Sequence, residues 1–133
     1  MKAVSARTTR GLNIGSFVTA ADNSGARIVK IVSVKGGKGR HKRQQPAKLA
    51  DWVKVSVRVG LLDMKGKVFD AVVIRQKKPY RRNTGERIAF IDNAVALLKD
   101  DKGNPKGTQI KGPVAREISE RWPQISKIAQ FVV

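Results

Sequence analysis

Hydrophobic and polar residues alternate most regularly between Asp51 and Leu61. One face of this segment, drawn as an extended chain, receives four valines: Val53, Val55, Val57 and Val59. The opposite face receives Lys54, Ser56 and Arg58. Because successive side chains of a β-strand point to opposite faces, this alternation predicts a half-buried strand, and the β-branched valines favour the same conformation.

Other segments show strand-like patterns of similar length. Residues 16–21 and 27–34 are separated by Asp22-Asn23-Ser24-Gly25, whose residue types favour a turn, so the two segments are predicted to form a hairpin. The remaining strands of the sheet are expected at residues 67–75, 88–91 and 94–98. Short strands at short spacing predict a mainly β protein built on a small antiparallel barrel, since closure removes the exposed strand edges.

The pattern changes from alternation to helical spacing near residue 112. Pro113 stands at a plausible first helical position, and Val114 and Ile118 follow at the spacing of one helical face. Pro123 is expected to end this helix, and one further helical turn is expected after it. The apolar residues 131–133 are expected to pack back on the barrel.

The length of 133 residues suits a single domain, residues 1–133, with a helical C-terminal segment at 112–133. The charge of the chain indicates that it binds a partner. The sequence has 28 Lys and Arg against 10 Asp and Glu, which gives a net charge of +18. The net charge falls from +10 over residues 1–50 to +6 over 51–90 and +2 over 91–133. Self-repulsion of this size favours nucleic acid as the partner over a uniformly basic soluble surface, and leaves the C-terminal third free for a different contact.

Two irregular segments carry much of the positive charge. Residues 35–48 contain three glycines and almost no apolar side chain, so they are expected to form an exposed loop. Residues 76–87 are expected to form a second basic loop or projecting hairpin. Phosphate contacts are expected from six of their cations: Arg40, Lys42, Arg43, Lys78, Arg81 and Arg82. His41 is expected to be solvated or in contact with RNA.

The role of one aromatic residue, Tyr80, is left open by the sequence, whereas two tryptophans are interpreted as core residues. Tyr80 stands between Lys77-Lys78 and Arg81-Arg82, where it could stack on an unpaired base or cap the barrel, and the sequence does not decide between the two. Trp52 and Trp122 each lie beside apolar periodic positions, so both are interpreted as packing residues.

The sequence offers little for catalysis or metal binding. It contains no Cys and one His, and neither a phosphate-binding G-x-x-x-x-G-K-[ST] loop nor a G-x-G-x-x-G motif is present. Local spacing brings no two carboxylates together for acid and base catalysis. No enzyme activity, cofactor or metal is therefore expected. The N-terminal residues lack an apolar signal region and no stretch is long enough to span a membrane, so a soluble protein without a membrane partner is expected.

Three stretches carry motifs that go beyond composition. They are, in chain order, Ala21-Asp22-Asn23-Ser24-Gly25-Ala26-Arg27; Ala71-Val72-Val73-Ile74-Arg75 with Tyr80-Arg81-Arg82, Gly85 and Asp92-Asn93; and Gly107-Thr108 with Lys111-Gly112-Pro113-Val114-Ala115-Arg116-Glu117. In order and spacing these stretches closely resemble the universal large-subunit ribosomal protein family numbered fourteen. An N-terminal extension, residues 1–12, and the stretch containing Arg121-Trp122 resemble its archaeal and eukaryotic branch.

The resemblance implies a five-stranded β-barrel with a projecting β-ribbon and short C-terminal helices, in a structural protein of the cytoplasmic ribosome. It further implies direct binding to large-subunit rRNA, a bridge to small-subunit rRNA, contact with neighbouring ribosomal proteins including the one numbered three, and docking of a factor that keeps the subunits apart. The basic ribbon and loop would then add these RNA-contacting residues: Lys35, Lys38, Lys48, Arg75 and Lys77. The bridge and docking face would contain Thr108, Gln109, Arg116, Glu120 and Arg121.

Two other classes of function are weighed against this one. A free-standing chaperone of single-stranded nucleic acid could also use a small barrel, but such proteins need several exposed aromatic platforms and this chain has seven aromatic residues, several of them in predicted strands. An enzyme acting on RNA would need a catalytic constellation that the sequence does not show.

Overall fold

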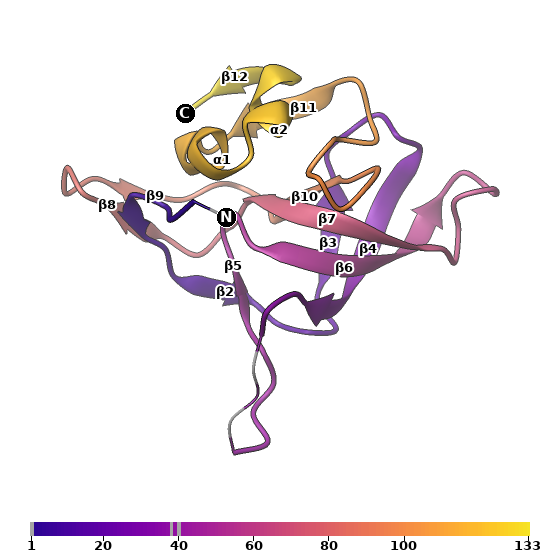
Figure 1. Cartoon of the computed structure of the whole chain (residues 1–133), viewed down its shortest axis with the longest axis horizontal. Helices are drawn as coiled ribbons and strands as arrows, with labels where there is room; N and C mark the ends of the chain where they lie inside the picture. The colour runs from indigo at the N-terminus through magenta and orange to yellow at the C-terminus, as the bar shows by residue number, and fades with distance from the viewer. Residues whose placement is uncertain (1, 38, 40) are drawn as a thin grey trace.

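The computed structural model describes residues 2–37, 39 and 41–133, and its centre is a closed five-stranded barrel (Figure 1). The barrel strands are β3 (Phe17–Ala20), β4 (Ala26–Val34), β6 (Trp52–Gly60), β7 (Val68–Arg75) and β10 (Ala94–Leu97). Their order around the barrel is β10-β3-β4-β6-β7. The predicted mainly β class and small barrel are confirmed. One pairing differs from the antiparallel expectation, because β10 closes the barrel parallel to β3.

Alternation in β6 places Val53, Val55 and Val57 in the barrel interior, where each is fully buried. Val59 departs from the predicted face and is 45% exposed. The cause is a register shift between β4 and β6, since Ile28 pairs with Val59 while the next residue of β4 pairs with Val57. A bulge of this kind interrupts the two-residue period of the strand.

The core consists of two clusters on either side of the barrel wall. One fills the barrel with aliphatic side chains such as Val29 and Ile31, and the other lies between the barrel and the C-terminal segment. In the second cluster the rings of Trp52 and Trp122 meet edge to face, with centroids 5.7 Å apart. Both tryptophans are buried, so their predicted packing role is confirmed.

A separate three-stranded sheet forms a ribbon at the left of Figure 1. It consists of β1 (Ala6–Arg7), β8 (Tyr80–Arg82) and β9 (Arg87–Ile88), in the order β1-β8-β9. The expectation that residues 88–91 extend the barrel sheet is therefore wrong, because β9 pairs with β8 and ends at Ile88. A two-stranded sheet of β2 (Arg10–Leu12) and β5 (Ala47–Lys48) closes the base of the loop that projects downward in Figure 1.

The C-terminal segment lies above the barrel and combines two strands with two short helices (Figure 1). Its elements are β11 (Ile110–Val114), α1 (Arg116–Arg121), α2 (Pro123–Lys127) and β12 (Ala129–Val132). The helix predicted from Pro113 begins at Arg116 instead, and Pro113 belongs to β11. A proline is tolerated there because β11 and β12 form a two-stranded sheet, in which Pro113 lies on an edge strand. Neither helix has the length and apolar composition needed to cross a membrane, within the residues described.

The end of the sequence packs differently from expectation. Residues of β12 pair in parallel with β11 rather than lying on the barrel wall, and Phe131 remains 56% exposed. The pairing satisfies backbone groups of both strands, as when the amide of Val133 donates to the carbonyl of Val114 at 2.9 Å. Apolar side chains of β12 are therefore left on the surface.

Candidate nucleic-acid interface

Three exposed arginines form a row across the ribbon. In the strand pairing, Arg7 of β1 lies opposite Arg81 of β8, which lies opposite Arg87 of β9. All three side chains are exposed. Like charges directly opposite each other on neighbouring strands are destabilising, so the protein alone gains nothing from this arrangement. A row of guanidinium groups can bind the successive phosphates of a nucleic-acid backbone.

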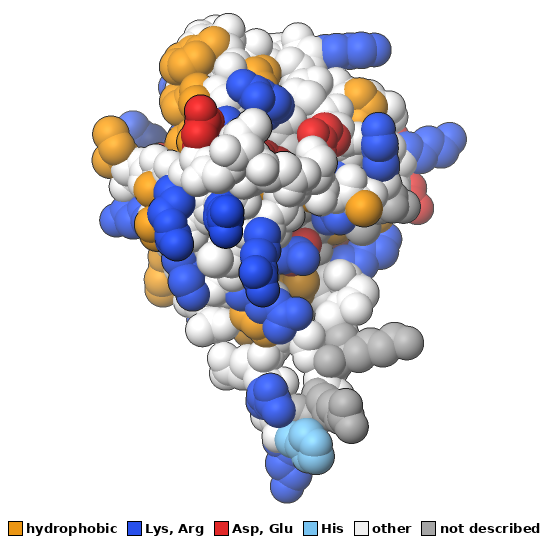
Figure 2. Space-filling view, turned by 90° about the vertical axis from the view of Figure 1, so that its left-hand side faces the viewer, with side chains coloured by type: hydrophobic (Ala, Val, Ile, Leu, Met, Phe, Trp, Pro, Cys, Tyr) orange, Lys and Arg blue, Asp and Glu red, His pale blue; other side chains and the backbone are white. Residues whose placement is uncertain are grey.

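The arginine row belongs to a broadly cationic side of the molecule. Figure 2 shows the side on which the ribbon lies, and Lys and Arg side chains gather across its middle and along the loop below. Lys77 and Lys78, at the start of the ribbon, are exposed, as predicted from their place in a basic loop. The amide of Lys77 donates to the side-chain oxygen of Asn93 at 2.8 Å, which anchors this segment to the barrel.

The opposite face of the ribbon is held by a buried polar cluster. Tyr80 donates to one carboxylate oxygen of Glu117 at 2.7 Å, and Nε of Arg82 donates to the other at 2.8 Å. Burial raises the pKa of Tyr80, and its hydrogen bond to Glu117 raises that pKa further. Burial alone would lower the pKa of Arg82, but hydrogen bonds to Glu117 and Tyr80 outweigh this effect and raise it. The ribbon is thus fixed to helix α1, which carries Glu117.

Three of the residues expected to bind RNA are buried, and their expected role is corrected here. Tyr80 and Arg82 are 1% and 7% exposed because the cluster with Glu117 uses their polar atoms. Arg75 is 6% exposed and bonds to the backbone oxygens of Lys111 and Pro113. Little of Arg75 and Arg82 is therefore left for a phosphate, and the buried ring of Tyr80 offers no platform for a base. Its alternative role as an internal packing residue is the one found.

The projecting loop presents a second group of cations. His41, Lys42 and Arg43 are exposed at its end, whereas Lys38 and Arg40, also expected to bind RNA, lie outside the residues described. Lys35 has a structural contact as well, because its ammonium lies 3.2 Å from the centroid of the Trp52 ring. At the base of the loop a polar cavity of about 300 Å³ is lined by residues that include Lys35, Lys48 and Arg10.

The predicted docking residues fall into two groups. Thr108 and Gln109 are exposed, and both are held by Asn23, whose side-chain oxygen accepts hydrogen bonds from the amide of Thr108 at 2.8 Å and that of Gln109 at 3.3 Å. Gly107 is required beside them, because a Cβ there would lie 2.8 Å from the same oxygen. The turn that carries Asn23 therefore fixes the position of this loop.

The second group lies on helix α1. Arg116 is exposed, but Glu120 and Arg121 bind the N-terminal segment. Glu120 accepts hydrogen bonds from the amide and the hydroxyl of Ser5, and these hold the pKa of Glu120 below its ordinary value. Nε of Arg121 donates to the backbone oxygen of Lys2 at 2.8 Å. These two residues anchor the chain that leads into β1, so they support the ribbon from within the protein.

Sequence reasoning did not select Arg7 or Arg87 as candidates. Arg7 lies outside both basic segments, and Arg87 ends the segment 76–87 but is separated from Arg82 by four non-basic residues. Their positions opposite Arg81 follow from strand pairing between segments far apart in the chain. Among the described residues, no group of three His, Asp or Glu side chains is arranged to hold a metal ion.

Comparison with known proteins gives a consistent result. The family model described as ribosomal protein L14p/L23e matches residues 11–133. A large ribosomal subunit protein uL14 of Nanoarchaeum equitans is 56% identical over 133 residues, which cover the whole of both chains. Proteins of the same description from Methanoregula boonei and Halobacterium salinarum are 51% and 48% identical, again over the whole of both chains.

Proposed function

The chain belongs to the ribosomal protein L14p/L23e family, and from this premise we propose that it binds large-subunit rRNA directly through its ribbon and its projecting loop. As a member of this family it is a structural protein of the large ribosomal subunit, found in the ribosome of the cytoplasm, and it is not an enzyme. The ribbon contributes Arg7, Arg81 and Arg87 to the proposed contact, and the loop contributes its exposed cations.

The arginine row is the observation that carries this proposal. Within the part of the chain that the structure describes, none of its three members forms an ion pair with a carboxylate. The pairing of β8 with both neighbours nevertheless holds the three side chains next to one another. A polyanion that neutralises them removes their repulsion and releases its own condensed counterions. The rigid cluster of Tyr80, Arg82 and Glu117 behind the row keeps the spacing fixed before RNA arrives.

Replacing Arg81 by Gln removes the central cation of the row. At about 0.15 M salt we expect affinity for large-subunit rRNA to fall roughly fivefold, and the slope of log K against log salt to become shallower by about one. Filter binding over a series of salt concentrations measures both quantities. Arg58→Gln is the matched control, because Arg58 is also exposed but lies on barrel strand β6. Equal slopes for Arg81→Gln and the unchanged protein would rule out a phosphate contact at Arg81.

We propose a second role for the C-terminal third, in contacts between the subunits and with other proteins. Its face at Thr108, Gln109 and Arg116 is proposed to take part in a bridge to small-subunit rRNA, in contacts with neighbouring ribosomal proteins including the one numbered three, and in docking of a factor that keeps the subunits apart. The net charge of +2 over residues 91–133 supports a contact that is less dominated by phosphate. Glu120 and Arg121 contribute to this role by holding the N-terminal segment beside α1.

Asn23→Ala tests the docking role without touching a proposed contact residue. The change removes the oxygen that holds the amides of Thr108 and Gln109, so the loop loses its fixed position. We expect subunit joining, followed by light scattering with reconstituted large subunits, to become several-fold weaker, while affinity for large-subunit rRNA stays within about twofold. Asn13→Ala, an exposed asparagine elsewhere, serves as the control. A parallel loss of rRNA affinity in Asn23→Ala would contradict the separation of the two roles.

A further inference from the structure

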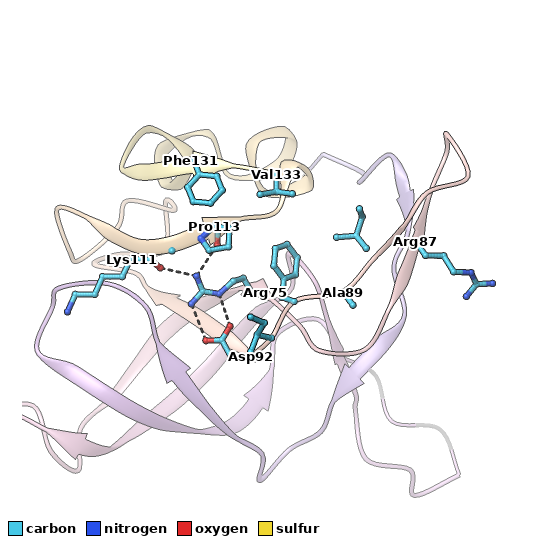
Figure 3. A pocket seen from close by; sticks show the side chains of 12 residues that line it. Arg75, Arg87, Ala89, Asp92, Lys111, Pro113, Phe131 and Val133 are labelled. Carbon is cyan, nitrogen blue, oxygen red and sulfur yellow. Dashed lines mark hydrogen bonds and ion pairs between the residues drawn. The ribbon is translucent and has the colours of Figure 1, made fainter.

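An apolar pocket of about 740 Å³ opens between the segment that follows β9 and the strands of the C-terminal segment (Figure 3). Seven of its lining residues are apolar: Ile88, Ala89, Phe90, Ile91, Pro113, Phe131 and Val133. Ile91 is 95% exposed and Phe131 is 56% exposed. The protein therefore leaves large apolar side chains in contact with water around a concave site, which is typical of a binding surface.

The floor of the pocket is formed by Arg75, whose guanidinium makes its hydrogen bonds and its ion pair within the protein. Figure 3 shows its guanidinium bonded to the backbone oxygens of Lys111 and Pro113, at 2.9 and 3.0 Å, and to Asp92. Nε of Arg75 lies 3.0 Å from a carboxylate oxygen of Asp92. Gly112 allows this close approach, because a Cβ there would lie 2.5 Å from a guanidinium nitrogen. Most of the hydrogen-bonding capacity of this guanidinium is thus used by Lys111, Pro113 and Asp92, which leaves little for the edge of a nucleobase.

The rim of the pocket is cationic. Arg87 and Lys111 lie at opposite ends in Figure 3, with their side chains directed away from the apolar centre. Both side chains are exposed. An apolar centre with a charged rim is the usual organisation of a protein interface, and cations at both ends favour a partner with acidic residues on either side of an apolar one.

We propose that this pocket binds an acidic segment of a protein through one or two large apolar anchor side chains. The anchors fill the space between Phe90, Ile91 and Phe131, and carboxylates on either side meet Arg87 and Lys111. A volume of this order accommodates such side chains. The pocket is separate from Thr108 and Gln109, so the inference extends beyond the docking role proposed above and does not depend on it.

The experiment uses the full-length protein and a fluorescent peptide, acetyl-Glu-Asp-Leu-Phe-Glu-Asp-amide. Anisotropy at about 0.15 M salt, where nonspecific attraction is screened, measures its affinity. Replacing the exposed Ile91 by Ser is expected to weaken binding roughly tenfold, because a large apolar contact is lost. A peptide with Ser in place of Leu and Phe should bind more weakly by a similar factor, and methyl NMR signals of Ile88 and Val133 should shift only with the apolar peptide.

Two results would overturn the proposal. Equal binding of the apolar and Ser-containing peptides would mean that the cationic protein attracts any acidic chain. Displacement of the Ile88 and Val133 signals by a short uridine oligonucleotide, but not by the peptide, would assign the pocket to RNA. Gln109→Ala separates this test from the docking role, since it changes the docking face without changing the charge beside Lys111, and should leave peptide affinity unaltered. The fold of Ile91→Ser is checked by its thermal unfolding, which should match that of the unchanged protein because the side chain is exposed.

Discussion

Replacing Glu117 by Ala is expected to lower the free energy of unfolding by about 3–5 kcal/mol. Glu117 is 3% exposed and is the acceptor for both Tyr80 and Arg82. Without it the guanidinium of Arg82 stays buried in the absence of its counter-charge, and the hydroxyl of Tyr80 loses its acceptor. Both effects destabilise the folded state alone, because in the unfolded chain the guanidinium and the hydroxyl form hydrogen bonds with water.

Urea unfolding followed by circular dichroism measures this loss. Glu120→Ala on the same helix is the control, and because Glu120 is partly exposed its replacement should cost less than about 1 kcal/mol. Combining Glu117→Leu with Arg82→Leu and Tyr80→Phe removes the polar groups together, and should recover most of the stability. A loss below about 1 kcal/mol for Glu117→Ala would mean that water or a rearranged side chain replaces the carboxylate.

The local pattern of the chain was sufficient to predict the barrel strands. In β6 the alternating valines specify both the strand and its buried face, because side-chain direction depends only on position along one strand. The bulge that exposes Val59 depends on pairing with β4, which the sequence of β6 does not contain. The start of α1 was misplaced for a similar reason, since Pro113 suits a helix start and an edge strand equally well, and pairing with β12 decides between them.

The candidate site was predicted less completely, and the ribbon shows why. Charge density selected Arg81 and Arg82 together, yet neighbouring residues of a strand face opposite sides, so one of the two must point inward. Applying that rule to Tyr80-Arg81-Arg82 would have assigned Arg82 and Tyr80 to the same face. The buried partner Glu117 is 35 residues away from Arg82, and no local signal links them. Arg7 and Arg87 were missed because the row exists only across strands.

The buried cluster also explains how the two proposed roles can share one small protein. Glu117 belongs to the C-terminal segment, while Tyr80 and Arg82 belong to the ribbon. Glu120 and Arg121 of the same helix hold the chain that leads into β1. Helix α1 therefore supports two of the three ribbon strands with its buried and half-buried side chains. The contacts to the ribbon come from the side of the C-terminal segment that faces the barrel and ribbon. Its exposed side is therefore available for the proposed contacts with proteins.

Replacing Arg7, Arg81 and Arg87 by Gln in one variant is expected to change affinity and stability in opposite directions. Three lost phosphate contacts should weaken binding to large-subunit rRNA roughly 100-fold at about 0.15 M salt, and make the salt dependence shallower by about two to three. The same variant should unfold with a free energy higher by about 0.5–1 kcal/mol at low salt, because like charges opposite each other no longer repel.

The matched control for this variant carries the same change in net charge at the opposite end of the barrel. Arg58, Lys65 and Lys67 are all exposed, and the turn between β6 and β7 that carries Lys65 and Lys67 lies far from the ribbon in Figure 1. Their replacement by Gln should weaken rRNA binding less than about fivefold, through the general field alone. Equal losses of rRNA affinity in the two variants would mean that the arginine row acts only through the overall positive charge of the protein. A large loss only in the ribbon variant, together with a gain in stability, would mean that the row is maintained for RNA binding at a cost to the free protein.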